Sequence, residues 1–149
     1  MRHAAWVCAV VLLAAGRLLA AEKPAEKAPV KPEDAALAAA EKWLKVVDAG
    51  DYGKSWEQAA VLFKDAMTQE KWLLAVRAAR RPLGKLVSRS LKSREHTTTL
   101  PGAPDGQFAV IQFEPTFERK ANGAEPVAPP LGPDGPWRVP GHHIRRRGG

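Results

Sequence analysis

Cysteine is nearly absent from this chain of 149 residues, because Cys8 is the only one. Cys8 lies in an apolar segment near the N-terminus, so a chain that has lost this segment has no disulfide and no reactive thiol. The chain also has no apolar run long enough to cross a membrane. Residues 4–16 are apolar but are soon followed by Arg17, whereas a spanning helix needs roughly 20 apolar residues.

Recognisable catalytic motifs are lacking as well. No serine lies in a nucleophile-elbow motif, and no glycine-rich loop has the phosphate-binding form. The histidines lack the spaced cysteine, histidine or aspartate partners that hold a metal ion. No basic stripe is interleaved with aromatic residues, as binding of single-stranded nucleic acid requires. We therefore predict no catalytic residue, no cofactor, no metal site and no nucleic-acid partner.

The N-terminal segment has the parts of a secretory signal peptide, which are a basic start, a short apolar core and small residues at the cleavage point. Arg2 supplies the basic start, residues 4–16 the apolar core, and Ala20 and Ala21 the small residues. We predict a signal peptide over residues 1–21, cleaved after Ala20 or Ala21, and a periplasmic or secreted bacterial protein. An uncleaved anchor is the alternative, since Arg17 is atypical ahead of a cleavage site.

Three further segments follow the predicted leader. Residues 22–32 mix charges, proline and alanine without apolar periodicity, which is typical of a flexible linker. We predict a single α+β domain over residues 33–144 and a disordered basic tail over residues 145–149. The net charge of +7 favours solubility and loose attraction to anionic surfaces rather than one specific partner.

The first half of the domain has the apolar spacing of helices. Pro32 and Gly50 are residues that begin and end a helix, and they bound the first one. A second helix is predicted from Ser55, which forms a capping-box pattern with Gln58, to about Met67. A third begins after Thr68 and ends before Pro82. Three tryptophans at helical spacing are predicted to lie in the core: Trp43, Trp56 and Trp72.

The second half has the features of an antiparallel sheet. Residues 85–100 and 107–119 read as strands separated by a turn at residues 101–106, and residues 107–119 alternate between apolar and polar. Asn122-Gly123 is a strong hairpin signal, and residues 137–144 read as a last strand. Helices followed by strands predict an α+β fold, with three N-terminal helices packed on a curved four-stranded antiparallel sheet.

Several local patterns resemble one family of small exported bacterial proteins, domain of unknown function 4019. The resemblance rests on Ala40-Glu41-Lys42-Trp43-Leu44, on residues 47–52 and 55–60, and on Leu100-Pro101-Gly102-Ala103-Pro104-Asp105-Gly106. The layout of three helices and a curved sheet is similar to NTF2-like folds. The resemblance implies export and a small α+β domain, and it carries over no catalytic residues. Prolines in the C-terminal part depart from the family pattern, and proline cannot donate to a sheet ladder.

The densest basic cluster is a candidate surface for an anionic ligand, a partner or phospholipid headgroups. A solvated helix face is the alternative interpretation. The cluster consists of Arg77, Arg80, Arg81, Lys85 and Arg89.

The histidines offer weaker candidates. His96 could act as a general base if Asp48 or Asp51 oriented it. His142 and His143 are adjacent, so in a strand they lie on opposite faces and cannot easily hold one metal ion.

The leading hypothesis is a non-catalytic domain that binds a small ligand or an envelope protein. The alternatives are a small isomerase or cyclase that uses His96 and a carboxylate, and an envelope-associating protein that uses its arginine cluster. The oligomeric state is left open.

Overall fold

The computed structural model describes residues 29–120, 123–141 and 144–146. Helices come first and strands afterwards, as the sequence predicts. The helices are α1 (Pro32–Asp48), α2 (Tyr52–Glu57), α3 (Val61–Ala66) and α4 (Gln69–Arg80). The strands are β1 (Leu86–Thr97), β2 (Phe108–Phe117), β3 (Gly123–Val127) and β4 (Arg145–Arg146).

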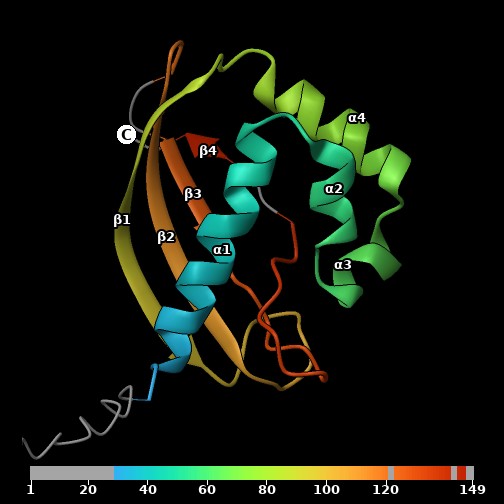
Figure 1. Cartoon of the computed structure of the whole chain (residues 1–149), viewed down its shortest axis with the longest axis vertical. Coiled ribbons are helices and arrows are strands. Elements are labelled where there is room, and N and C mark those ends of the chain that lie inside the picture. The colour runs from blue at the N-terminus through green and yellow to red at the C-terminus, as the bar shows by residue number, and fades with distance from the viewer. Residues whose placement is uncertain (1–28, 121–122, 142–143, 147–149) are drawn as a thin grey trace, which may run out of the picture.

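The strands β1, β2 and β3 form an open antiparallel sheet in that order, and the two-residue β4 adds to the edge of β3. The ladder between β1 and β2 has two register shifts, which increase the local twist of a strand pair. Figure 1 shows β1 and β2 bent, with α1 lying against them and α2 to α4 beyond α1. The predicted α+β class is therefore confirmed.

The alternation predicted for β2 is present in the structure. Ala109, Ile111, Phe113 and Phe117 are buried, as is Pro115, while the residues that alternate with them are half-buried. The inward face of β2 meets the buried residues of α1, which recur at helical spacing. Together with Trp72 and Val76 of α4, Val127 and Val139, they form the core of the domain.

The described residues form four helices where three are predicted, because the predicted second helix is divided into α2, which ends at Glu57, and α3, which begins at Val61. The Ala60 N–H donates to the Val139 carbonyl at 2.8 Å instead of continuing the helical ladder. The capping prediction at Ser55 is also wrong, since the side chain of Asp51 caps α2. Thr68 does cap α4, accepting a hydrogen bond from the Lys71 N–H.

Ser55 instead joins two of the core tryptophans. Its carbonyl accepts from the Trp43 indole at 2.7 Å, and its hydroxyl accepts from the Trp72 indole at 2.9 Å. Trp43 and Trp72 are buried, and Trp56 packs against the core while partly exposed. The prediction that these aromatic residues belong to the core is confirmed.

The predicted last strand over residues 137–144 is wrong for the described part of that range. Trp137 makes an isolated bridge with Leu131, and the rest of residues 138–141 is irregular. Pro136 and Pro140 have no N–H to donate, which explains the lack of a ladder there. Arg145 and Arg146, from the predicted tail, form β4.

Candidate functional site

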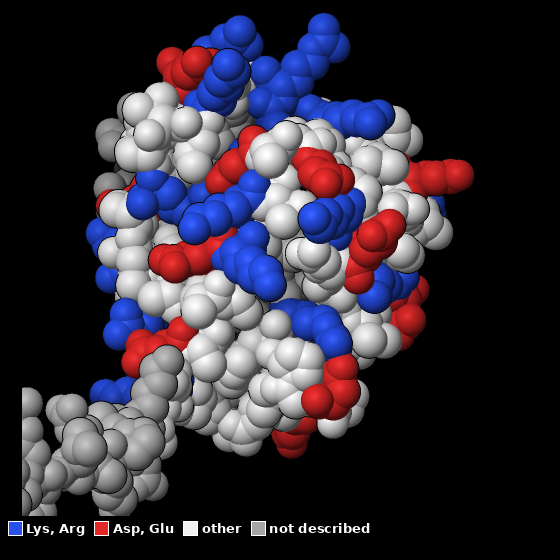
Figure 2. Space-filling view, viewed as in Figure 1, with Lys and Arg blue, Asp and Glu red and all other residues white. Residues whose placement is uncertain are grey.

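A basic cleft of about 680 Å³ lies where the C-terminal end of α4 meets the start of β1 and the end of β2. Figure 2 shows lysine and arginine side chains gathered at this end of the molecule, at the top of the view. The lining residues come from α1, α2, α4, β1 and the two connecting segments. They are Asp48, Tyr52, Arg77, Arg80, Arg81, Gly84, Lys85, Leu86, Glu118 and Arg119.

Backbone and side-chain hydrogen bonds fix the two connecting segments against each other. The Glu118 N–H donates to the Lys85 carbonyl at 3.0 Å, and the Glu118 carboxylate accepts from the Lys85 N–H at 2.9 Å. The Arg119 guanidinium donates to the Arg81 carbonyl at 3.3 Å. Gly84 has φ +77°, and a Cβ there would lie 2.8 Å from the Glu118 carboxylate. A glycine is therefore needed where the two segments approach.

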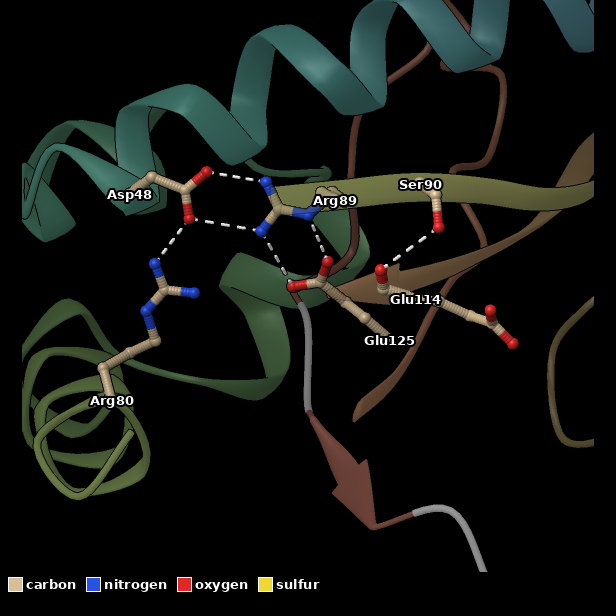
Figure 3. Close-up of polar contacts among 6 residues, drawn as sticks. All are labelled: Asp48, Arg80, Arg89, Ser90, Glu114 and Glu125. Carbon is tan, nitrogen blue, oxygen red and sulfur yellow. Dashed lines mark hydrogen bonds and ion pairs between the residues drawn. The ribbon is translucent and has the colours of Figure 1, made fainter. Parts of the chain in front are cut away.

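A buried ion-pair network lies beside the cleft and joins three elements (Figure 3). Arg89 of β1 bonds Asp48 of α1 through Nη1 at 2.6 Å and Nη2 at 3.2 Å. It also bonds Glu125 of β3 through Nε at 2.5 Å and Nη2 at 3.2 Å. Glu125 is fully buried and Arg89 is 11% exposed. This network holds α1 against the sheet from within.

Arg80 connects the network to the cleft. Its Nη2 donates to the Asp48 carboxylate at 2.5 Å, and its guanidinium lies 4.8 Å from the centre of the Phe117 ring. The side chain is 7% exposed, and its Nη1 is buried without a hydrogen-bond partner among the described residues. A buried donor without a partner costs free energy, so it calls for an explanation.

The arginines lower the pKa of the Asp48 carboxyl. Burial by itself raises this pKa, but the hydrogen bonds and charges of Arg89 and Arg80 outweigh it and hold the pKa below its usual value of 3.8. Folding then favours the ionised carboxylate. The resulting stabilisation is fully present above pH 3.8 and is lost as the pH falls from there through the lower pKa of the folded state.

We therefore expect the free energy of unfolding to decline as the pH falls below about 4. An Asp48→Asn variant lacks this titration, so it should be less stable at pH 6 and should lose less on acidification. Urea unfolding at pH 6 and pH 3 checks both. An equal loss for both proteins would show that Asp48 is not responsible.

The structure brings together four of the five predicted cluster residues, Arg77, Arg80, Arg81 and Lys85, around the basic cleft. Arg89 does not line the cleft, because it points into the network with Asp48 and Glu125. Arg119 lines the cleft and is not among the residues predicted from the sequence. Its signal is the antiparallel register, since Leu86 pairs with Phe117 and so places residues 118–119 beside the start of β1.

His96 does not meet either carboxylate suggested for it. Its Nε2 lies 2.5 Å from the Gln107 side-chain oxygen, and its ring contacts Trp137 edge-on. Arg89, which bonds Asp48, is seven residues away along β1, which corresponds to roughly 23 Å in an extended strand. Asp51 caps α2. The geometry of a histidine–carboxylate pair is therefore not found at His96.

Within residues 29–120, 123–141 and 144–146, no group of histidine, cysteine or acidic side chains could hold a metal ion. His142 and His143 lie outside this range. No helix of the described part is long and apolar enough to cross a membrane.

Fold and site together define a small α+β domain with an open antiparallel sheet and a basic cleft at one end. The chain matches the family described as "Protein of unknown function (DUF4019)" over residues 39–142, and it belongs to that family. The resemblance noted in the sequence is thereby confirmed. No curated protein and no solved structure matches the chain.

Proposed function

We propose that this protein is an exported bacterial binding domain without catalytic activity, and that an anionic ligand occupies its basic cleft. The observation that carries this proposal is the surplus of positive charge in the cleft. Asp48 is already paired with Arg80 and Arg89, and the Glu118 carboxylate accepts the Lys85 N–H. Among the described residues, no carboxylate pairs with the four exposed cations Arg77, Arg81, Lys85 and Arg119.

Four unpaired cations on one concave surface repel one another, and an anion reduces this repulsion. Long exposed side chains could separate in water if they were free to do so. Here the Arg119 guanidinium is held against the Arg81 carbonyl, and Arg77 and Arg81 lie one helical turn apart. The Arg119 guanidinium is therefore held at one place in the cleft, as a binding site requires of its donors.

The NTF2-like interpretation of the fold is part of this proposal. Helices that cover one face of a bent antiparallel sheet support it. In such a domain a ligand could lie between the helices and the sheet. In this chain that interior holds Trp43, Leu44 and Val47 together with the buried Arg89 network. We therefore assign the ligand to the basic cleft at the rim rather than to the interior.

The features that support export are in the sequence. A basic start, the apolar residues 4–16 and the small residues Ala20 and Ala21 have the order of a cleaved leader. Fractionation of the producing cell, with mass analysis of the mature N-terminus, tests export. An N-terminus at Ala21 or Glu22 in the periplasm or medium supports it, and a full-length cytoplasmic chain overturns it.

Replacing Arg81 by alanine tests the binding site. Arg81 is exposed and forms no ion pair with a described carboxylate, so the variant should fold normally. We expect the affinity for sulfate, measured by the rise in melting temperature with concentration, to fall about tenfold, because hydrogen bonds to charged groups contribute about 1.5–3 kcal/mol.

Arg94→Ala is the matched control. Arg94 is 41% exposed and pairs with Asp34 away from the cleft, so its removal should leave sulfate binding unchanged. Equal losses for the two variants would mean that sulfate responds only to overall charge, and the proposal would fail.

A further inference from the structure

We propose that the anion is the dianionic phosphomonoester group of an organic phosphate, with Arg80 as the donor at the floor of the basic cleft. This inference rests on the proposed function, since it names the chemistry of the ligand of the same cleft. Three observations carry it: the kind of cations, the unsatisfied donor on Arg80, and the size and mixed lining of the cleft.

Arginine supplies most of the positive charge. Arg77, Arg80, Arg81 and Arg119 line the cleft with one lysine, Lys85. The planar guanidinium offers two parallel donors that match two oxygens of a phosphate group, and it stays charged at any physiological pH. The five cations outnumber the two acids of the cleft, Asp48 and Glu118. This surplus suits a ligand with two negative charges better than one with a single charge.

The packing of the Arg80 side chain leaves one of its guanidinium donors without a hydrogen-bond partner among the described residues. Asp48 holds Nη2 and the Phe117 ring covers the guanidinium face, while Nη1 has no hydrogen-bond partner among the described residues. The guanidinium therefore cannot turn to satisfy Nη1 without losing Asp48. An oxygen of a ligand beside Arg80 would satisfy it. Because Nη1 is buried, we expect a neighbouring long side chain of the cleft to move when the ligand binds.

The cleft is larger than a bare oxyanion needs. Its volume of about 680 Å³ lies within the range of about 300–1,000 Å³ that is typical of sites for small organic molecules. Tyr52 and Leu86 line it beside the cations. An aromatic ring and an aliphatic side chain offer contact to an organic group, so the lining fits a phosphate ester rather than inorganic phosphate alone.

Four soluble probes at pH 7.5 test whether the cleft prefers a dianionic phosphomonoester or binds any anion. Glycerol 3-phosphate is a dianionic monoester, dimethyl phosphate is a tetrahedral monoanion, acetate is a planar monoanion, and glycerol carries no charge. By isothermal titration of the full mature chain, we expect glycerol 3-phosphate to bind at least tenfold more tightly than dimethyl phosphate or acetate. Glycerol should not bind.

The outcomes distinguish the two levels of the proposal. If acetate or dimethyl phosphate binds as tightly as glycerol 3-phosphate, the anion site stands and the phosphomonoester assignment is overturned. If no anion binds, neither in solution nor on a vesicle, the proposed function itself fails.

A lipid headgroup and a soluble ester share this chemistry, and flotation separates the two sources. Vesicles of phosphatidylcholine with and without phosphatidic acid, which has a phosphomonoester headgroup, are compared. Flotation that requires phosphatidic acid, without binding of glycerol 3-phosphate, supports the assignment with a lipid as the source. Binding of glycerol 3-phosphate without flotation supports it with a soluble source.

The Arg80→Lys variant tests the floor donor. Lysine keeps the charge and can still pair with Asp48, but it has no second donor on a planar fork. We expect its preference for glycerol 3-phosphate over acetate to fall at least fivefold, with the melting temperature reporting that the chain is folded. If this variant does not fold, the exposed Arg81→Lys takes its place with the same expectation. An unchanged preference in the folded variant overturns the role of the arginine fork.

Discussion

Replacing Arg89 by methionine is expected to lower the free energy of unfolding by about 3–5 kcal/mol, because it removes one partner from a buried ion-pair network. Arg89 bonds both carboxylate oxygens of Glu125, which is fully buried, and both of Asp48. Methionine fills much of the same volume, so the loss arises from charge rather than from a cavity. Urea unfolding at pH 7 measures it.

Lys92→Met is the matched control for this change. Lys92 also lies on β1 and pairs with an acid of β2, Glu114, but its side chain is 53% exposed. Exposed ion pairs contribute about 0–1 kcal/mol, so the control should stay within 1 kcal/mol of the parent. If Arg89→Met also lowered the free energy of unfolding by less than about 1 kcal/mol, the network would not stabilise the fold.

The same account predicts a partial rescue. In a chain that carries Arg89→Met, the further change Glu125→Leu removes the buried carboxylate with which Arg89 pairs in the parent protein. The double variant should therefore be more stable than Arg89→Met alone, because replacing buried charged partners together is often less harmful than removing one.

Replacing Gly141 by alanine is expected to lower the free energy of unfolding by about 2–4 kcal/mol. Gly141 has φ +91°, and a Cβ there would lie 2.6 Å from Cε2 of Phe63. The Phe63 ring packs edge-on against Trp72, with 5.3 Å between the ring centres, so the core restrains its movement. Backbone strain and overlap therefore add. Urea unfolding of the folded variant gives the value.

Gly102→Ala separates the two contributions. Gly102 has a similar φ of +80°, and a Cβ there would meet nothing within 4 Å. Only strain remains, which corresponds to about 1–2 kcal/mol. If Gly141→Ala cost no more than Gly102→Ala, the close packing of the C-terminal segment on Phe63 would be refuted.

Local patterns in the sequence predict most of the fold. The errors arise where tertiary contacts determine whether a helix or strand continues. The α1 boundaries and the alternation of β2 follow from helix-ending residues and from period-two spacing. The break between α2 and α3 does not, because it depends on the hydrogen bond from Ala60 to Val139, 79 residues further along the chain. The predicted last strand is not found in its described part, because the effect of its prolines on pairing depends on which strand lies beside them.

The candidate site shows a similar division. Basic residues close together in sequence identify one wall of the cleft, since Arg77, Arg80, Arg81 and Lys85 lie on α4 and in the segment that follows it. The sequence alone does not separate Arg80 and Arg81, which face the cleft, from Arg89, which is buried against Glu125. A glutamate at an inward position of β3, between buried Gly123 and Val127, is the available signal, because a buried carboxylate requires a partner.

The location of anion binding tests the central claim most directly. Amide ¹H–¹⁵N spectra of the mature protein, recorded during titration with glycerol 3-phosphate, report which residues sense the ligand. The account predicts saturable shifts that are largest over residues 77–86 and 118–119, and small near His96 and Arg94. Shifts that are largest elsewhere, or that grow linearly without saturation, would contradict a binding site in the basic cleft.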